Sequence, residues 1–501
     1  MSRYRIVFGP NISKRVKARI SYAFRVFCAV YGHSVVSDHV SGSAITIYYG
    51  TAAFLPGVVQ DAIHIPARYL ERPASEPAPK LGRFLYADEW FDLFYGVDNL
   101  GRPDWLGEIF EWISAADEIS QEARDAVGRI PFEKSIFSRQ GKTPARPRAI
   151  LAMAWLEGYL RYGRTKSKLV KAPSPVEGID HFVIASHDID IHWTQQWRWR
   201  DRVKRQLKNA LICPLESRSA SLLASSTGRL LKSMLGMRVD DFIPSLLEAA
   251  REKDFQSTLF VIANSVHRRD ANYQLEHLAP KLREAALAGF DVDLHASYTS
   301  IVEKCDLRSE AVLLSNHTRR YPSGNRQHWL RFDSHHKLFS EIERARLIYD
   351  STLGFSNQVG FRNGACFAFP PYNFSKEESY NFLEIPLAIM DRALLHASRS
   401  SGRSFADLTD EVLEESRRFG WGGISMLWHN PMEDVYVPRA VNQIFWDRIR
   451  DKNAYREKWV SASSFLAASL TRYHAAGLLQ NMGIQNTETK PVNLHAQAAN
   501  C

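Results

Sequence analysis

Two carboxylates and an imidazole follow one apolar segment near the middle of the chain. Residues 181–185 read HFVIA, and residues 186–190 read SHDID. A short apolar run that ends in acids predicts a buried strand, and sheets and barrels of parallel strands place their chemistry at the carboxyl ends of those strands. An isolated D-x-D is more often a turn after a strand, because Asp favours turns. The rest of the chain must decide between these interpretations.

Polar clusters also end several later apolar segments. Taken alone, each such histidine, arginine or acid is more often a structural group than a functional one. Five clusters at the ends of predicted parallel strands are hard to explain by packing, because in a barrel these ends converge on one mouth. The clusters contain His295 and Tyr298; Arg326, His328 and Arg331; Arg362; Asp391; and Trp428 and His429.

The residue types indicate hydrolytic chemistry. Aspartate and neutral histidine together select a borderline divalent ion such as Zn²⁺, which polarises a carbonyl when one coordination position stays open. A second carboxylate can take a proton from water, and a histidine opposite can protonate the leaving group. A nearby arginine can orient that carboxylate or hold an anionic substrate. Such a set is suited to hydrolysing an amide or an ester.

Alternating strands and helices must position these groups. From residue 179 onward, apolar runs alternate with amphipathic helical patterns, which predicts an α/β fold with a parallel sheet, open or closed into a barrel. A strand–helix–strand pattern before residue 50 predicts a smaller α/β domain. We expect an N-terminal domain over 1–170 and a barrel over 179–475. The expected barrel strands are 181–186, 257–263, 290–295, 327–332, 383–388 and 423–428.

A basic insertion interrupts this alternation over residues 192–240. Its first part is rich in Arg, Lys and Trp, with leucines behind them. Such a segment is typical of a helix that lies on a membrane surface, which would give the protein a peripheral membrane contact. Charge runs are more often solvated faces, so we favour a solvated helical excursion beside the site. The polar segment 484–501 is expected to be disordered.

The composition excludes some function classes. The chain has 64 Lys and Arg against 55 Asp and Glu, a formal charge of +9 that permits an anionic partner but requires none. No zinc-finger spacing, RNA-binding signature or long basic tail is present, so we expect no nucleic-acid partner. Five scattered cysteines without a C-x-x-C pair, no secretory signal and no membrane-spanning run predict a cytoplasmic protein with reduced thiols.

Taken together, the motifs resemble those of the polysaccharide deacetylase family of NodB type (carbohydrate esterase family 4). They are most similar to those of a bacterial subgroup with an extra N-terminal domain. The matching segments read SHDID, LHASY, RQHWLRF, YDSTLGF followed by GFR, EIPLAIMD and LWHN, between residues 186 and 430. The resemblance implies a distorted (β/α) barrel. It also implies metal-dependent removal of an acetyl group from a sugar.

The resemblance assigns a base and a metal site. Asp188 corresponds to the base and Asp190 to a metal ligand, although the spacing D-x-D, in place of adjacent acids, leaves an exchange of the two open. His295 corresponds to the first histidine ligand. The second histidine of the family falls at Thr299, so we expect His328 to replace it. Weaker candidates for this third ligand are His187 and Ser300.

Other roles follow from the same motifs. Arg362 resembles the arginine that orients the base, and His429 resembles the histidine that acts as general acid. Asp391 is expected to pair with His429. The remaining polar and aromatic residues of the motifs are expected to bind the carbohydrate substrate: Arg326, Arg331, Tyr298 and Trp428.

Three functions remain open at this point. The first is a Zn²⁺-dependent hydrolase that deacetylates a surface-polysaccharide or glycolipid precursor. The second is a carbohydrate-binding member of the fold without activity, since one family ligand is replaced. The third is a glycoside hydrolase, which needs two carboxylates that Asp188 and Asp391 could supply. We favour the first, because polar clusters gathered in a cleft indicate chemistry.

Overall fold

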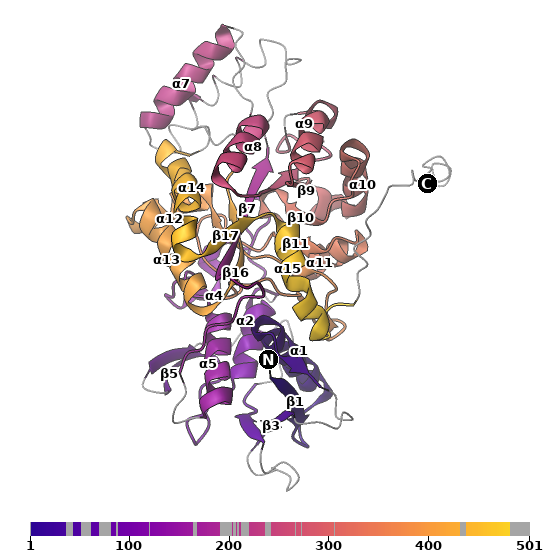
Figure 1. Ribbon diagram of the computed structural model, residues 1–501, viewed down its shortest axis with the longest axis vertical. Coiled ribbons are helices and arrows are strands. Elements are labelled where there is room, and N and C mark those ends of the chain that lie inside the picture. The colour runs from indigo at the N-terminus through magenta and orange to yellow at the C-terminus, as the bar shows by residue number, and fades with distance from the viewer. Residues whose placement is uncertain are drawn as a thin grey trace, which may run out of the picture.

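A computed structural model shows a barrel of parallel strands ringed by helices, with a smaller N-terminal unit at one end (Figure 1). The predicted fold class, α/β with a distorted (β/α) barrel after a smaller α/β domain, is confirmed. Most of the insertion 192–240 and all of the segment 484–501 lie outside the described residues. The described residues are 2–36, 44–51, 62–69, 82–86, 89–119, 121–163, 168–190, 203, 207, 210–211, 220–235, 242–265, 267–271, 273–304, 306–430 and 437–480.

Within the described part of the chain, the barrel sheet has nine strands, and all of them pair in parallel. Eight of them follow the order β14-β11-β10-β9-β8-β7-β16-β15, and β17 pairs with β7. Because the strands are parallel, the groups at their carboxyl ends meet at one rim. The strands are β7 (His181–Ile189), β8 (Thr258–Val261), β9 (Asp291–Ala296), β10 (Gly324–Gln327), β11 (Tyr349–Asp350), β14 (Leu383–Glu384), β15 (Leu387–Met390), β16 (Gly422–Leu427) and β17 (Glu457–Val460).

The two edge strands of this sheet are consecutive in the chain. Only Ile385 and Pro386 separate β14 from β15. The amide of Ile385 donates to Asp350 beside β11, whereas the carbonyl of Pro386 accepts from Ser425 in β16, each at 2.8 Å. The predicted single strand 383–388 is therefore two short strands with different partners. This crossing closes the barrel.

Helices cover the outside of the sheet (Figure 1). Of the insertion 192–240, the structure describes mainly α7 (Ala220–Met234), which stands at the end opposite the N-terminal unit. Among the described residues, no helix is long and apolar enough to cross a membrane. The barrel helices are α8 (Phe242–Lys253), α9 (Leu275–Leu287), α10 (Leu307–Thr318), α11 (His335–Arg344), α12 (Asp391–Ser401), α13 (Phe405–Phe419), α14 (Arg439–Asp451) and α15 (Ala462–Ala475).

The N-terminal unit is built on a small parallel sheet in the order β2-β1-β3-β4. Helix α1 buries an apolar face at Val16 and Ile20, as its helical spacing predicts, and it is buried on all sides from Val26 to Tyr31. The elements of this unit are β1 (Arg3–Phe8), α1 (Lys14–Tyr31), β2 (Ser34–Val35), β3 (Ile45–Gly50), β4 (Ile63–Pro66), β5 (Gly82–Tyr86), β6 (Glu89–Leu93), α2 (Trp105–Ile113), α3 (Ala116–Ile119), α4 (Ile136–Arg139) and α5 (Arg148–Tyr162).

Two ion pairs, one partly buried and one buried, join the N-terminal unit to the barrel. Arg19 of α1 donates to both carboxylate oxygens of Glu377 at 2.8 and 2.9 Å. Glu118 of α3 accepts from Arg362 at 2.8 Å and lies 3.2 Å from His335. Charges removed from water at such an interface are costly unless they are paired, so these contacts fix the orientation of the two parts.

The predicted strand 327–332 is wrong in its extent. Strand β10 ends at Gln327, and a single turn of 3₁₀ helix covers His328–Leu330. Trp329 has φ 63° and Leu330 has φ 52°, which is left-handed backbone. Each such conformation costs about 1–3 kcal/mol for a residue with a side chain. The chain turns sharply here instead of extending the sheet.

Strand β7 has a different partner along each half of one edge. His181 to Ile184 pair with β17, whereas Ser186 to Ile189 pair with β8. The β17 half is held by the buried carboxylate of Glu457, which accepts from His181 at 2.8 Å and from Arg417 at 3.0 Å. Burial alone would raise the pKa of Glu457, but His181 and Arg417 lower it to about 2.

We therefore predict a pH-dependent loss of stability in Glu457→Gln. The folded state holds this pKa below the ordinary value, so the charged pair stabilises the fold above about pH 4.5 and this gain disappears as the pH falls towards 2. In urea titrations, the free energy of unfolding of the variant should be about 3 kcal/mol below that of wild type at pH 7. The difference between the two proteins should be much smaller at pH 3. Glu411→Gln, which removes an exposed partner of Arg403, should change stability by less than about 1 kcal/mol. Equal effects of the two variants at pH 7 would contradict this account.

Candidate active site

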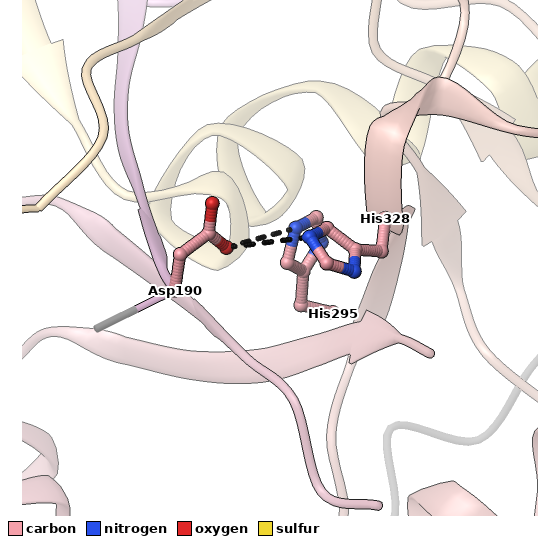
Figure 2. Close-up of side chains that lie close together, drawn as sticks. All are labelled: Asp190, His295 and His328. Carbon is pink, nitrogen blue, oxygen red and sulfur yellow. Dashed lines mark ion pairs between the residues drawn. The ribbon is translucent and has the colours of Figure 1, made fainter. Parts of the chain in front are cut away.

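Asp190, His295 and His328 come together at the carboxyl rim of the barrel (Figure 2). Asp190 follows β7, His295 lies in β9, and His328 follows β10. Oδ1 of Asp190 lies 3.7 Å from Nε2 of each histidine. The three ligand atoms lie within 4.8 Å of one another. The two histidines are buried, and Asp190 is partly exposed.

Each histidine is oriented by a hydrogen bond at its other nitrogen. Nδ1 of His295 donates to the carbonyl of Arg326 at 2.7 Å, and Nδ1 of His328 lies 3.3 Å from Oδ1 of Asp270. These bonds leave the Nε2 lone pairs directed at Asp190, as in metal sites where a carbonyl or carboxylate holds each ligating histidine. Asp270 also accepts from the amide of Tyr298 at 2.7 Å, so its own position is fixed. Asp270 stands outside the sequence motifs, and no pattern around it indicates this role.

The donor set fits a zinc ion. Oδ1 of Asp190 is buried and accepts no hydrogen bond from the described residues, although buried carboxylate oxygens are normally paired. One oxygen and two imidazole nitrogens are ligands that zinc accepts, and tetrahedral ligands about 2.1 Å from an ion lie about 3.4 Å from each other. Burial lowers the pKa of His295, which favours the neutral form that binds metals.

Asp188 lies beside this cluster and is held by a buried arginine. Its Oδ1 accepts from Nη1 of Arg326 at 2.8 Å, and its Oδ2 lies 3.4 Å from Nε2 of His295. Burial alone would raise the pKa of Asp188, but His295 and Arg326 lower it to about 2. The carboxylate is therefore ionised at neutral pH.

The expectation that Arg362 orients the base is wrong. Nε of Arg362 donates to Glu118 and its Nη1 donates to the carbonyl of Gly354 at 2.8 Å. It therefore joins the N-terminal unit to the barrel, and Arg326 holds Asp188 in its place. Both arginines belong to strand-end motifs, and only the register of the closed barrel shows which side chain points at the acid.

His429 and Asp391 form the expected pair. Nδ1 of His429 lies 2.8 Å from Oδ1 of Asp391, and the amide of His429 donates to Oδ2 of the same carboxylate at 2.9 Å. Nε2 of His429 faces Asp190, 4.0 Å from its Oδ2. Burial lowers the pKa of His429, but Asp391 and Asp190 raise it to about 9, so the imidazole is protonated at neutral pH.

Two of the expected substrate-binding residues cannot reach a substrate. The side chains of Arg326 and Trp428 have no exposed surface, and Trp428 packs on Phe445 in the core. Tyr298 is almost buried, and Nη1 of Arg331 donates to the carbonyl of Tyr298 at 2.7 Å. A substrate contact by Tyr298 or Arg331 remains a prediction.

The weaker candidates for the third ligand are placed differently. His187 lies between the rings of Phe242 and Phe445 in the core, where burial lowers its pKa to about 4. Ser300 is fully buried at the start of a turn of π-helix. The structure groups His328, and neither of these two residues, with Asp190 and His295.

Comparison with known proteins gave no match to a family model and none to a curated protein. Solved structures that resemble the chain include a Mycobacterium smegmatis protein described as a polysaccharide deacetylase, with 16% identity and a TM-score of 0.35 over 65% of this chain and 100% of that one. A family 4 carbohydrate esterase from Streptomyces lividans, solved with acetate, has 11% identity and a TM-score of 0.28 over 56% and 92% of the two chains. Peptidoglycan deacetylase PdaC from Bacillus subtilis has 7% identity and a TM-score of 0.28 over 59% and 95%.

The chain is thus similar to polysaccharide and peptidoglycan deacetylases, as its motifs indicate. The geometry of the rim residues is what supports an activity.

The hydrogen bond from His328 to Asp270 makes a testable prediction about metal affinity. Asp270→Asn should lower zinc affinity about 10- to 100-fold, because the ligating imidazole loses its charged acceptor. Competition with a chromophoric chelator measures this directly. Asp291→Asn is the control, since Asp291 is a buried aspartate that lies at the opposite end of β9 and accepts from the amide of Ser463. Zinc affinity that falls equally in both variants would contradict the role of Asp270.

Proposed function

We propose that this protein is a zinc-dependent hydrolase that removes an acetyl group from a sugar of a surface-polysaccharide or glycolipid precursor. The observation that carries the proposal is that Asp190, His295 and His328 lie together, with Asp188 on one side and His429 on the other, while the buried Oδ1 of Asp190 accepts no hydrogen bond from the described residues. When bound there, a zinc ion would polarise the acetyl carbonyl and acidify water.

Asp188 is the base in this proposal. It is ionised, and the hydrogen bond from Arg326 occupies one of its oxygens. Its second oxygen, 3.4 Å from Nε2 of His295, lies beside the site and can accept the proton of an attacking water. Arg326 keeps this carboxylate from rotating, which preserves the geometry that proton transfer needs.

His429 is the general acid. Asp391 occupies its Nδ1, so the proton on Nε2 faces the site near Asp190. A pKa of about 9 keeps this proton in place at neutral pH. It can stabilise the negative charge that develops on the former carbonyl oxygen, and it can then protonate the departing amine or alkoxide.

The geometry disfavours a glycoside hydrolase. Such an enzyme needs two carboxylates that flank the glycosidic bond. Asp391 is buried, and both of its oxygens accept hydrogen bonds from His429. It is therefore committed to orienting the imidazole. The cytoplasmic location and the membrane contact through residues 192–240 stay predictions.

Asp188→Asn tests the assignment of the base. Because Asn cannot accept the proton, turnover should fall at least about 100-fold while about one zinc per chain remains bound. Acetate release from acetylated oligosaccharides measures turnover, release of reducing ends detects a glycosidase, and metal analysis measures zinc. His295→Ala should lose the zinc instead.

Two outcomes would contradict the proposal. Loss of zinc from Asp188→Asn would mean that Asp188 and Asp190 have exchanged roles. Zinc-loaded wild-type protein that releases no acetate from N- or O-acetylated oligosaccharides would leave the non-catalytic carbohydrate-binding alternative.

A further inference from the structure

Trp329 is a large, exposed aromatic residue next to the metal-site candidates. It is 42% exposed, and its ring centroid lies 6.2 Å from that of His328. The ring of Tyr298 meets the indole in a T-shaped arrangement with 6.3 Å between the ring centroids, and the guanidinium of Arg269 lies over the indole at 5.4 Å. An indole supported in this way offers an apolar surface, and its side chain loses little conformational entropy when a ligand binds.

The backbone of Trp329 adopts a strained conformation. Its φ of 63° belongs to the left-handed region, in which large side chains are rare. Strain of this kind concentrates at ligand sites, where the surroundings impose it. The conformation turns the indole out of the sheet immediately after His328.

The clamp turn, residues 124–129 of the N-terminal unit, holds this segment in place. It meets the backbone just after β10 from a part of the chain about 200 residues earlier. Three hydrogen bonds join the two segments, and each is accepted by a main-chain carbonyl, so they fix the backbone path of the segment after β10. They run from Arg129 Nη1 to the carbonyl of Trp329 (3.2 Å), from Arg331 Nε to the carbonyl of Val127 (2.8 Å) and from Arg124 Nη2 to the carbonyl of Asp333 (2.6 Å).

A second turn of the N-terminal unit, residues 98–102, is built in the same way. Both turns have the pattern D-x-x-G-R, with a left-handed glycine at the fourth position. In each, the first aspartate accepts from the amides two and four residues later and forms an ion pair of 2.7 Å with the arginine. Arg129 also reaches the barrel, at the carbonyl of Trp329, whereas Arg102 bonds to Asp98 of its own turn.

We infer that Trp329 is a platform on which a pyranose ring of the substrate stacks, and that the clamp turn sets its position. This inference rests on the proposed function, because it places a saccharide at the rim. The apolar face of a pyranose matches the exposed indole, and Arg269 beside it supplies hydrogen-bond donors for hydroxyl or carboxylate groups. The N-terminal unit thus contributes to the substrate site without contacting the reacting bond.

Comparison of a saccharide with a small ester tests the platform. In the zinc-loaded full-length protein, Trp329→Ala should raise KM for penta-N-acetylchitopentaose about tenfold. It should lower kcat/KM for 4-nitrophenyl acetate far less, because that ester has no second ring to stack. Trp329→Phe should recover most of the loss. Tyr162→Ala, which removes an aromatic residue that is also 42% exposed, should leave both substrates unaffected.

The clamp turn has its own matched pair of variants. Arg129→Ala should raise KM for the pentasaccharide several-fold with little change in kcat, whereas Arg102→Ala, which damages the same kind of turn, should leave KM unchanged. Equal KM values in wild type and Trp329→Ala, or pentasaccharide binding too weak to detect by calorimetry in wild type, would overturn the inference. If the proposed function were wrong but the platform correct, wild-type protein would bind the pentasaccharide measurably and release no acetate from it.

Discussion

A fully buried guanidinium fixes the strands that carry the site. Arg326 has no exposed surface, and a buried cation is several kcal/mol unfavourable unless it is well paired. Asp188 of β7, Ser425 of β16 and Ser351 beside β11 accept its hydrogen bonds at 2.8, 2.7 and 3.2 Å. Its guanidinium also lies 4.1 Å from the ring of Phe260 in β8. Strands from several parts of the barrel are therefore held in one register by the group that also aligns the base.

The amino-acid sequence predicted what depends on local pattern and residue type. Apolar runs that end in polar residues located most of the barrel strands, and parallel pairing then placed Asp190, His295 and His328 at one rim. The choice of His328 followed from the need for a third nitrogen or oxygen ligand. The motifs also led us to expect the pair of His429 and Asp391, and the two residues meet because they follow the neighbouring strands β16 and β15.

Contacts that depend on how distant strands and loops align in the folded barrel could not be predicted in this way. Arg326 and Arg362 have the same chemistry, and only barrel closure decides which one meets Asp188. The left-handed backbone at Trp329 has no signal in the sequence, since glycine or asparagine would be expected there. Asp270 lies within the loop between β8 and α9, outside the motifs, and it meets His328 from 58 residues away.

Strand β7 is the first barrel strand to be synthesised, but its ladder is completed by β17, the last strand along the described part of the chain. Its residue His181 lies 276 residues before its partner Glu457 in β17. At roughly 5–20 residues per second, a ribosome needs roughly 15–55 s to add that partner. Throughout this interval an apolar strand has an open edge, which is the kind of edge that pairs with other nascent chains. The yield of folded protein in a cell therefore depends on elongation rate and on chaperones that bind extended apolar segments.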